Sequence, residues 1–151
     1  MMFNDTGMNH MQLYLGSNIP QYMERFAFFA CKELGLDRLR GEITIRLGRT
    51  LDGESYGLCW GDRQEAEIHI ATKQWGKSIT REDKLKTLAH ELTHAHQYLS
   101  GALKCDLTSE EFKSVWHKKE YRYLPDDEAD LPWEVSARYY EELIYKKWQQ
   151  L

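Results

Sequence analysis

The feature that most constrains the fold is a polar pentapeptide, His90-Glu91-Leu92-Thr93-His94, set within an apolar helical pattern. The apolar positions recur every three or four residues, which predicts a helix; they are Leu85, Leu88, Ala89, Leu92, His96 and Leu99. Thr80 followed by Asp83 resembles a capping box, and Ser100-Gly101 marks the end. The sequence therefore predicts one amphipathic helix that carries the pentapeptide.

The spacing within the pentapeptide favours a metal site. His90 and His94 are four residues apart, so their side chains leave a helix on one face, one turn apart. Two imidazoles so placed can bind one ion, and Glu91, about 100° round the helix, can take a proton from a water molecule that the metal activates. H-E-x-x-H on a helix therefore predicts zinc with Glu91 as the catalytic base. The alternative is an ordinary helix with two surface histidines, and His96 is interpreted as a packed core histidine.

A zinc site of this kind needs a third protein ligand, and we predict Glu134. Glu134 follows Pro132-Trp133 at the start of a predicted C-terminal helix. Ala137, one turn later, is small enough for two helices to approach closely. The alternative role of Glu134 is to stabilise the helix N-terminus. The other candidates for the third ligand are, in order, His117, Glu141 and Asp130.

The rest of the chain predicts a small α+β domain over residues 18–151. A helix is expected from an Asn18 cap to Gly35. Within residues 112–123, a hairpin is favoured over a helix. Three alternating segments, 43–47, 56–60 and 66–70, predict a mostly antiparallel three-stranded sheet. Residues 1–17 are an N-terminal arm of unclear structure, in which 12–15 could form a short strand. Residues 126–128 are expected to be a solvated loop.

Net charge, apolar runs and cysteines limit the compartment and the kinds of partner that are expected. The chain has 151 residues and a net charge of −4, which argues against a general nucleic-acid binder. The longest apolar run, residues 26–31, is too short to cross a membrane, and no export signal is recognised. Three widely spaced cysteines, Cys31, Cys59 and Cys105, are expected to be reduced thiols. These features predict a cytoplasmic protein with no membrane association, and they leave the oligomeric state open.

Residues 90–94 together with the Glu-x-x-Ala of Glu134–Ala137 resemble the zincin metallopeptidases of the gluzincin type. More narrowly, the chain is similar to small phage and bacterial zincin-like proteins. In these, a Trp-x-x-x-x-Tyr hairpin and a Pro-Trp-Glu-x-x-Ala segment follow the active-site helix, here Trp116–Tyr121 and Pro132–Ala137. Gluzincins of the IrrE type have a related Glu-x-x-Ala helix. The resemblance covers roughly residues 40–145, and it departs from the pattern at the hairpin turn, where His117-Lys118-Lys119-Glu120 lacks the expected glycine.

This resemblance implies a zinc-dependent metallopeptidase, a hydrolase that acts on a protein or peptide substrate. His90, His94 and Glu134 would hold Zn²⁺, and Glu91 would serve as the general base. The implied architecture packs a small sheet on the N-terminal helix, with residues 67–70 as the edge strand that pairs with substrate. Tyr121 is the first candidate for an oxyanion donor, ahead of Tyr123, Arg138, Tyr139, Tyr140 and His117.

Two other functions stay open at this stage. One is a non-proteolytic, zinc-stabilised binding module of phage or mobile-element origin that acts on a host protein. The other is a DNA-associated protease like the Sprt group, which uses a third histidine, for which His117 is the candidate. The only dense basic segments available to bind DNA are Lys118-Lys119 and Lys146-Lys147.

Overall fold

The computed structural model describes residues 2–3, 10–105 and 112–151, and it has the α+β architecture that the sequence predicts. Residues 1 and 4–9 of the predicted N-terminal arm lie outside the described residues. The three α-helices are α1 (Gln21–Leu34), α2 (Arg81–Leu99) and α3 (Pro132–Gln149). Short 3₁₀ turns are η1 (Leu36–Arg38), η2 (Asp52–Glu54) and η3 (Pro125–Asp130), the last of which contains the predicted loop at 126–128.

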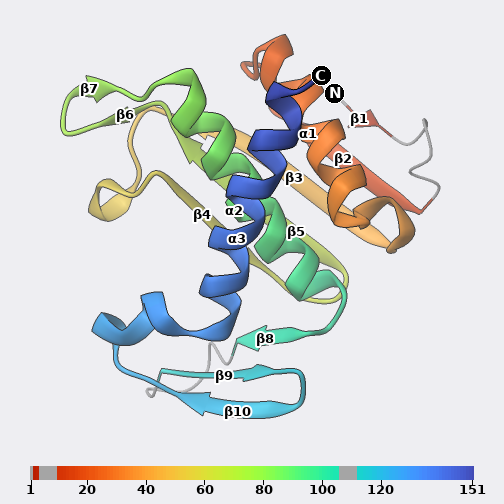
Figure 1. Cartoon of the computed structure of the whole chain (residues 1–151), viewed down its shortest axis with the longest axis vertical. Helices are drawn as coiled ribbons and strands as arrows, with labels where there is room; N and C mark the ends of the chain where they lie inside the picture. The colour runs from red at the N-terminus through yellow and green to blue at the C-terminus, as the bar shows by residue number, and fades with distance from the viewer. Residues whose placement is uncertain (1, 4–9, 106–111) are drawn as a thin grey trace.

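A five-stranded mixed sheet forms one layer of the molecule, with the strand order β1-β2-β3-β5-β4 (Figure 1). Its strands are β1 (Met2–Phe3), β2 (Met11–Leu15), β3 (Gly41–Gly48), β4 (Gly57–Gly61) and β5 (Glu65–Ala71). A separate hairpin consists of β6 (Lys73–Gln74) and β7 (Lys77–Ser78). A second, three-stranded sheet consists of β8 (Leu103–Cys105), β9 (Lys113–Trp116) and β10 (Lys119–Arg122), so the predicted hairpin is confirmed.

The prediction of a three-stranded antiparallel meander is wrong in its pairing. β3 pairs parallel with β5, and β4 folds back antiparallel on the outer side of β5. The reason lies in the inward-facing side chains. β5 contributes Ala66, Ile68 and Ile70 to the core, whereas the inward positions of β4 are Gly57, Cys59 and Gly61. Only the larger apolar side chains can fill the centre of the sheet, so β5 is internal and β4 is at the edge.

The segment 11–15 is a core strand, which confirms the alternative of a short strand at 12–15 in the N-terminal arm. β2 pairs parallel with β3, and its residues Met11, Leu13 and Leu15 are buried. The alternation of these apolar residues with Gln12 and Tyr14 is the signal of a strand with one buried face. The five-stranded sheet therefore begins before the first helix.

The helix ends show which capping predictions hold. Thr80 caps α2, because its hydroxyl accepts a hydrogen bond from the backbone N–H of Asp83 at 3.1 Å, as predicted. Gly35 ends α1 in the left-handed conformation (φ 76°), also as predicted. The prediction of Asn18 as the cap of α1 is wrong: Pro20 holds the N-cap position in extended backbone, without a side-chain hydrogen bond.

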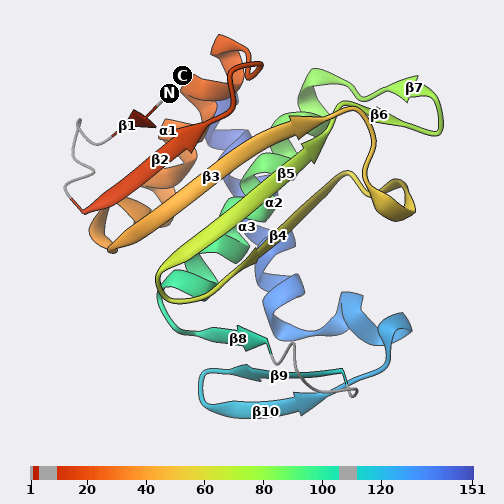
Figure 2. The same ribbon diagram turned by 180° about the vertical axis from the view of Figure 1, so that it is seen from behind.

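Helices cover one face of the five-stranded sheet, and Figure 2 shows the other face without a helix across it. α1 and α2 pack directly on the sheet through a core that includes Phe26, Leu88 and Leu92. α3 lies on the far side of α2 from the sheet and returns to α1, where Trp148 meets Phe26 edge-on at 5.4 Å. In the described part of the chain, no helix has both the length and the apolar character needed to span a membrane.

The small sheet lies against the end of α2 and the start of α3 (Figure 1). Trp133 at the start of α3 is buried there, with Trp116, Tyr121 and Tyr123 packed around its ring at centroid distances of 5.6–6.2 Å. This packing fixes the entrance of α3. As a result, the residue after Trp133, which is Glu134, has a defined direction.

Candidate metal centre

α2 presents His90 and His94 side by side on the flank that faces α3. The two rings are 4.9 Å apart and nearly perpendicular. His94 is buried and His90 is partly buried, so α2 holds both imidazoles away from bulk solvent. His90, Glu91 and His94 each offer a ligand atom within 4.8 Å of the other two. The helical spacing of the pentapeptide thus produces the convergence that the sequence predicts.

Glu134 completes the cluster from α3. Its carboxylate oxygens lie 3.2 Å from Nε2 of His90 and 2.9 Å from Nε2 of His94. Ala137, fully buried one turn later, lets α3 pack closely on α2. Two ligands that each lie about 2.0–2.1 Å from a tetrahedral zinc ion are about 3.3 Å apart. Each of the two contacts is close to that spacing, so Glu134, which contacts both inner nitrogens, could serve as a third ligand beside the His90, Glu91 and His94 group.

A second set of hydrogen bonds orients the two rings. Nδ1 of His94 lies 2.7 Å from Oε1 of Gln97, and Nε2 of Gln97 donates to the carbonyl of Trp133 at 3.0 Å. Because that carbonyl can only accept, the Gln97 oxygen must face His94, and Nδ1 of His94 must be the donor. Nδ1 of His90 faces Oε1 of Glu141 at 2.7 Å in the same way. In the neutral form, each ring therefore keeps the lone pair of Nε2 for a metal.

The electrostatics of the metal-free cluster follow from these contacts. Burial lowers the pKa of His90, but its hydrogen bonds to Glu134 and Glu141 outweigh burial and raise that pKa to about 10. The pKa of His94 is also raised, because Glu134 offsets the effect of burial. Burial acts to raise the pKa of Glu134, but the two histidines hold it well below its usual range. Without metal, these contacts therefore favour the ionised form of Glu134 and the protonated forms of the two histidines.

Glu91 points into a cavity of about 400 Å³ next to the two histidines. It is only 6% exposed, and burial raises the pKa of its carboxyl group. The edge strand β4 forms the opposite wall through Gly57, Leu58 and Cys59. A Cβ on Gly57 would lie 3.1 Å from Cγ of Glu91, so the glycine makes room for this side chain. The arrangement places a buried carboxylate beside the two histidines, within reach of a water molecule that a bound metal would hold.

The other candidate ligands lie elsewhere. Glu141 contacts the outer nitrogen of His90 instead of the side where Glu134 lies. His117 is in the turn between β9 and β10, where its ring contacts Trp116 at 4.4 Å, and it does not line this cavity. Asp130 is exposed in η3. His96, expected in the core, is only partly buried and lines a different pocket.

Tyr121, the first candidate for an oxyanion donor, does not line the cavity beside the two histidines. It packs edge-on against Trp133, whereas Tyr123 and Arg138 line the cavity. Sequence reasoning overlooked Gln97, although it follows His94 by three residues and so lies on the same side of the helix. It also overlooked Tyr98, which lines the cavity and whose hydroxyl lies 3.3 Å from Sγ of Cys105.

The prediction of residues 67–70 as the edge strand is wrong, because they belong to β5, which lies between β3 and β4. The edge next to the cavity is β4.

No protein-family model, curated protein or solved structure matches the chain.

Proposed function

We propose that this protein is a zinc-dependent peptidase in which His90, His94 and Glu134 hold the metal. The observation that carries the proposal is the contact of one carboxylate, from α3, with the inner nitrogens of two histidines on α2 at 2.9 and 3.2 Å. Two histidines and one carboxylate suit zinc best among common divalent ions, and three protein ligands leave one position open. The resemblance to gluzincins carries the step from a zinc site to peptide hydrolysis.

Zinc in such a site would act as a Lewis acid and would bring the ionisation of water close to neutral pH. Glu91 accepts a proton from the attacking water and then delivers it to the amine of the leaving peptide. Its buried position supports this role, because a raised pKa makes the carboxylate a stronger base. Tyr123 and Arg138 line the cavity and are the donors best placed to meet a developing negative charge.

The substrate chain would bind along β4. The backbone N–H of Ala71 donates to the carbonyl of Tyr56, and the N–H of Asp62 donates to Glu65, which sets the register between β4 and β5. The alternation of an antiparallel ladder then directs the backbone groups of Gly57, Cys59 and Gly61 away from β5. These groups lie at the free edge beside the cavity, where an extended peptide can add as a further strand.

The test compares the wild-type protein with Glu91→Gln, each loaded with zinc. Both should bind one equivalent of zinc, because Glu91 is not one of the three ligands. We expect the variant to lose about 100-fold or more in the rate of cleavage of an unfolded casein carrying a fluorescent label. Metal content and circular dichroism establish that the variant is loaded and folded.

Glu82→Gln is the matched control, since Glu82 is an exposed glutamate on the same helix. It should cleave casein at the wild-type rate. Equal cleavage by wild-type protein and Glu91→Gln would overturn the assignment of Glu91 as the base. Zinc binding with no cleavage of unfolded or folded protein by the wild type would overturn the peptidase.

A further inference from the structure

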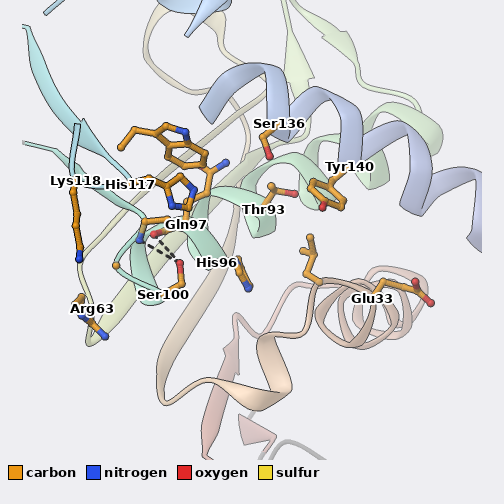
Figure 3. A pocket seen from close by; sticks show the side chains of 14 residues that line it. Glu33, Arg63, Thr93, His96, Gln97, Ser100, His117, Lys118, Ser136 and Tyr140 are labelled. Atoms are coloured by element: carbon orange, nitrogen blue, oxygen red, sulfur yellow. Dashed lines mark hydrogen bonds between the residues drawn. The ribbon is translucent and has the colours of Figure 1, made fainter. Parts of the chain in front are cut away.

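A second pocket, of about 640 Å³, lies beside α2 and shares no lining residue with the cavity of the metal cluster (Figure 3). Its walls come from α2, the start of α3, the end of α1 and two turns. One turn follows β4 and carries Arg63, and the other joins β9 to β10 and carries His117 and Lys118. We refer to it as the Arg63 pocket. Of its lining residues, the proposed zinc site uses only Gln97, which orients His94.

The charged groups of the Arg63 pocket are unequally distributed. Arg63, His117 and Lys118 lie toward one end in Figure 3, and Glu33 lies at the other. Glu33 is already neutralised by an ion pair with Lys147 at 3.0 Å. Within the described ranges, neither Arg63 nor Lys118 forms an ion pair with a carboxylate. One end of the pocket therefore carries two positive charges that no carboxylate of the described residues neutralises, in a protein whose net charge is −4.

The side chain of Arg63 is exposed, and its guanidinium lies against Gly101. A Cβ on Gly101, which has a φ of +81°, would lie 3.1–3.2 Å from Nη1, Cζ and Nε of Arg63. The guanidinium therefore lies over the bare Cα of a glycine. It is not needed to cap α2, because the carbonyls of His96 and Tyr98 already accept from the backbone N–H groups of Ser100 and Gly101. Its N–H groups stay available to an external acceptor.

The turn that carries the other two groups has an unusual sequence for its backbone. His117 (φ 47°) and Lys118 (φ 70°) are both in the left-handed region, where two-residue hairpin turns usually have Asn and Gly. Side chains at these positions cost stability relative to glycine. The chain nevertheless places an imidazole and an ammonium group here, on the wall of the Arg63 pocket. Contact with a ligand in the pocket would offset the backbone cost of having side chains at these two positions.

From these observations, we propose that the Arg63 pocket binds a small organic phosphate. Arg63 would engage the phosphate through paired N–H donors, Lys118 would add a second positive charge, and the ring of His117 would offer a further hydrogen-bonding group. The volume lies within the range for drug-sized ligands, about 300–1,000 Å³, and exceeds what a free phosphate ion fills. Tyr140 and Ser136, on the α3 side of the pocket in Figure 3, offer an aromatic ring and a hydroxyl to the rest of the ligand.

Calorimetric titration of the zinc-loaded full chain tests the proposal, with adenosine monophosphate as the organic phosphate and adenosine and inorganic phosphate as comparisons. We expect saturable binding of the monophosphate and at least about tenfold weaker binding of adenosine, since charge-assisted hydrogen bonds are the strong ones. Binding of inorganic phosphate equal to that of the monophosphate would support the anion site but identify free phosphate as its ligand. Binding should persist in metal-free protein, which separates this site from the zinc.

Arg63→Gln and Lys118→Asn should each weaken binding about tenfold or more. Asn is chosen at position 118 because it tolerates the left-handed backbone. Lys77→Gln removes the same charge from an exposed position in β7 and should leave binding unchanged. The proposal is overturned if neither phosphate binds, if adenosine binds as tightly as its monophosphate, or if Lys77→Gln weakens binding as much as Arg63→Gln. Loss of casein cleavage plays no part in these outcomes, so the two proposals fail independently.

Discussion

His94 is fixed by a chain of contacts that runs from one helix to the next. Gln97 accepts from its Nδ1 and donates to the carbonyl of Trp133, and Trp133 directly precedes Glu134, the proposed third ligand. One buried amide therefore sets the tautomer of a histidine and the position of α3 relative to it. Side chains that hydrogen-bond to metal ligands orient those ligands. Here the same side chain also links α2 to α3.

Removing that amide should weaken the metal site without removing a ligand. We expect Gln97→Leu to lower zinc affinity about 10- to 100-fold, because the His94 ring loses its orienting acceptor. Competition with a chromophoric chelator measures this change. Gln149→Leu, at an exposed position near the end of α3, should keep wild-type affinity. Unchanged affinity in Gln97→Leu would mean that the amide does not orient the ligand.

The raised pKa of His90 predicts a pH dependence for the protein freed of metal by a chelator. The folded-state pKa of about 10 exceeds the ordinary 6.5, so folding is favoured by the retained proton. That contribution is complete below about pH 6.5 and is lost as the pH rises through 10. Urea unfolding over this range should show a falling free energy of unfolding. Glu134→Gln should make the decline smaller, and an equal decline in the variant would contradict this origin.

At the scale of elements, α2 approaches β4 closely because β4 has a glycine where they meet. A Cβ on Gly57 would lie 2.6 Å from Cγ2 of Thr87, closer than real contacts allow. The same approach brings the free edge of the sheet next to Glu91. The proposed path of substrate beside Glu91 therefore depends on this small residue.

Gly57→Ala should therefore move β4 away from α2. We expect a loss of about 1–3 kcal/mol in the free energy of unfolding from overpacking, together with reduced cleavage of casein. Gly48→Ala is the matched control, since a Cβ there would find ordinary contacts at 3.7 Å or more. Urea denaturation of both variants provides the comparison. Equal stability of the two variants would contradict the close approach.

At the scale of the whole molecule, the metal cluster joins the helix that packs on the sheet to the helix outside it. His90 and His94 belong to α2, whereas Glu134 and Glu141 belong to α3. A bound ion would thus link two layers of the fold. Its binding free energy would be added to the stability of the whole domain.

Zinc should therefore raise the midpoint of thermal unfolding. With free zinc at about 1,000 times its Kd, the gain is about 4 kcal/mol, or roughly 10 °C for a chain of this size. Differential scanning calorimetry with and without a chelator measures the change, and re-addition of zinc should restore it. Glu134→Gln should show a much smaller rise, whereas a full rise in that variant would exclude Glu134 as a ligand.

The sequence by itself determined the features that depend on neighbouring residues. The cap of α2 at Thr80, the end of α1 at Gly35 and the convergence of His90 and His94 all follow from geometry within one or two helical turns. The choice of Glu134 also came from local signals, namely the proline that starts α3 and the small residue one turn later. Helix periodicity is local, and a local pattern can be read without knowing the rest of the fold.

Only the tertiary structure decided which strands pair, which residue orients each ring and where the Arg63 pocket lies. β4 and β5 have similar alternation, so their order in the sheet depends on which inner face fills the core better, and packing of the whole domain decides that. Arg63, His117 and Lys118 come from two distant turns and meet only after the helices have packed. Contacts between segments far apart in the chain are set by the energy of the complete core, which no short stretch of sequence contains.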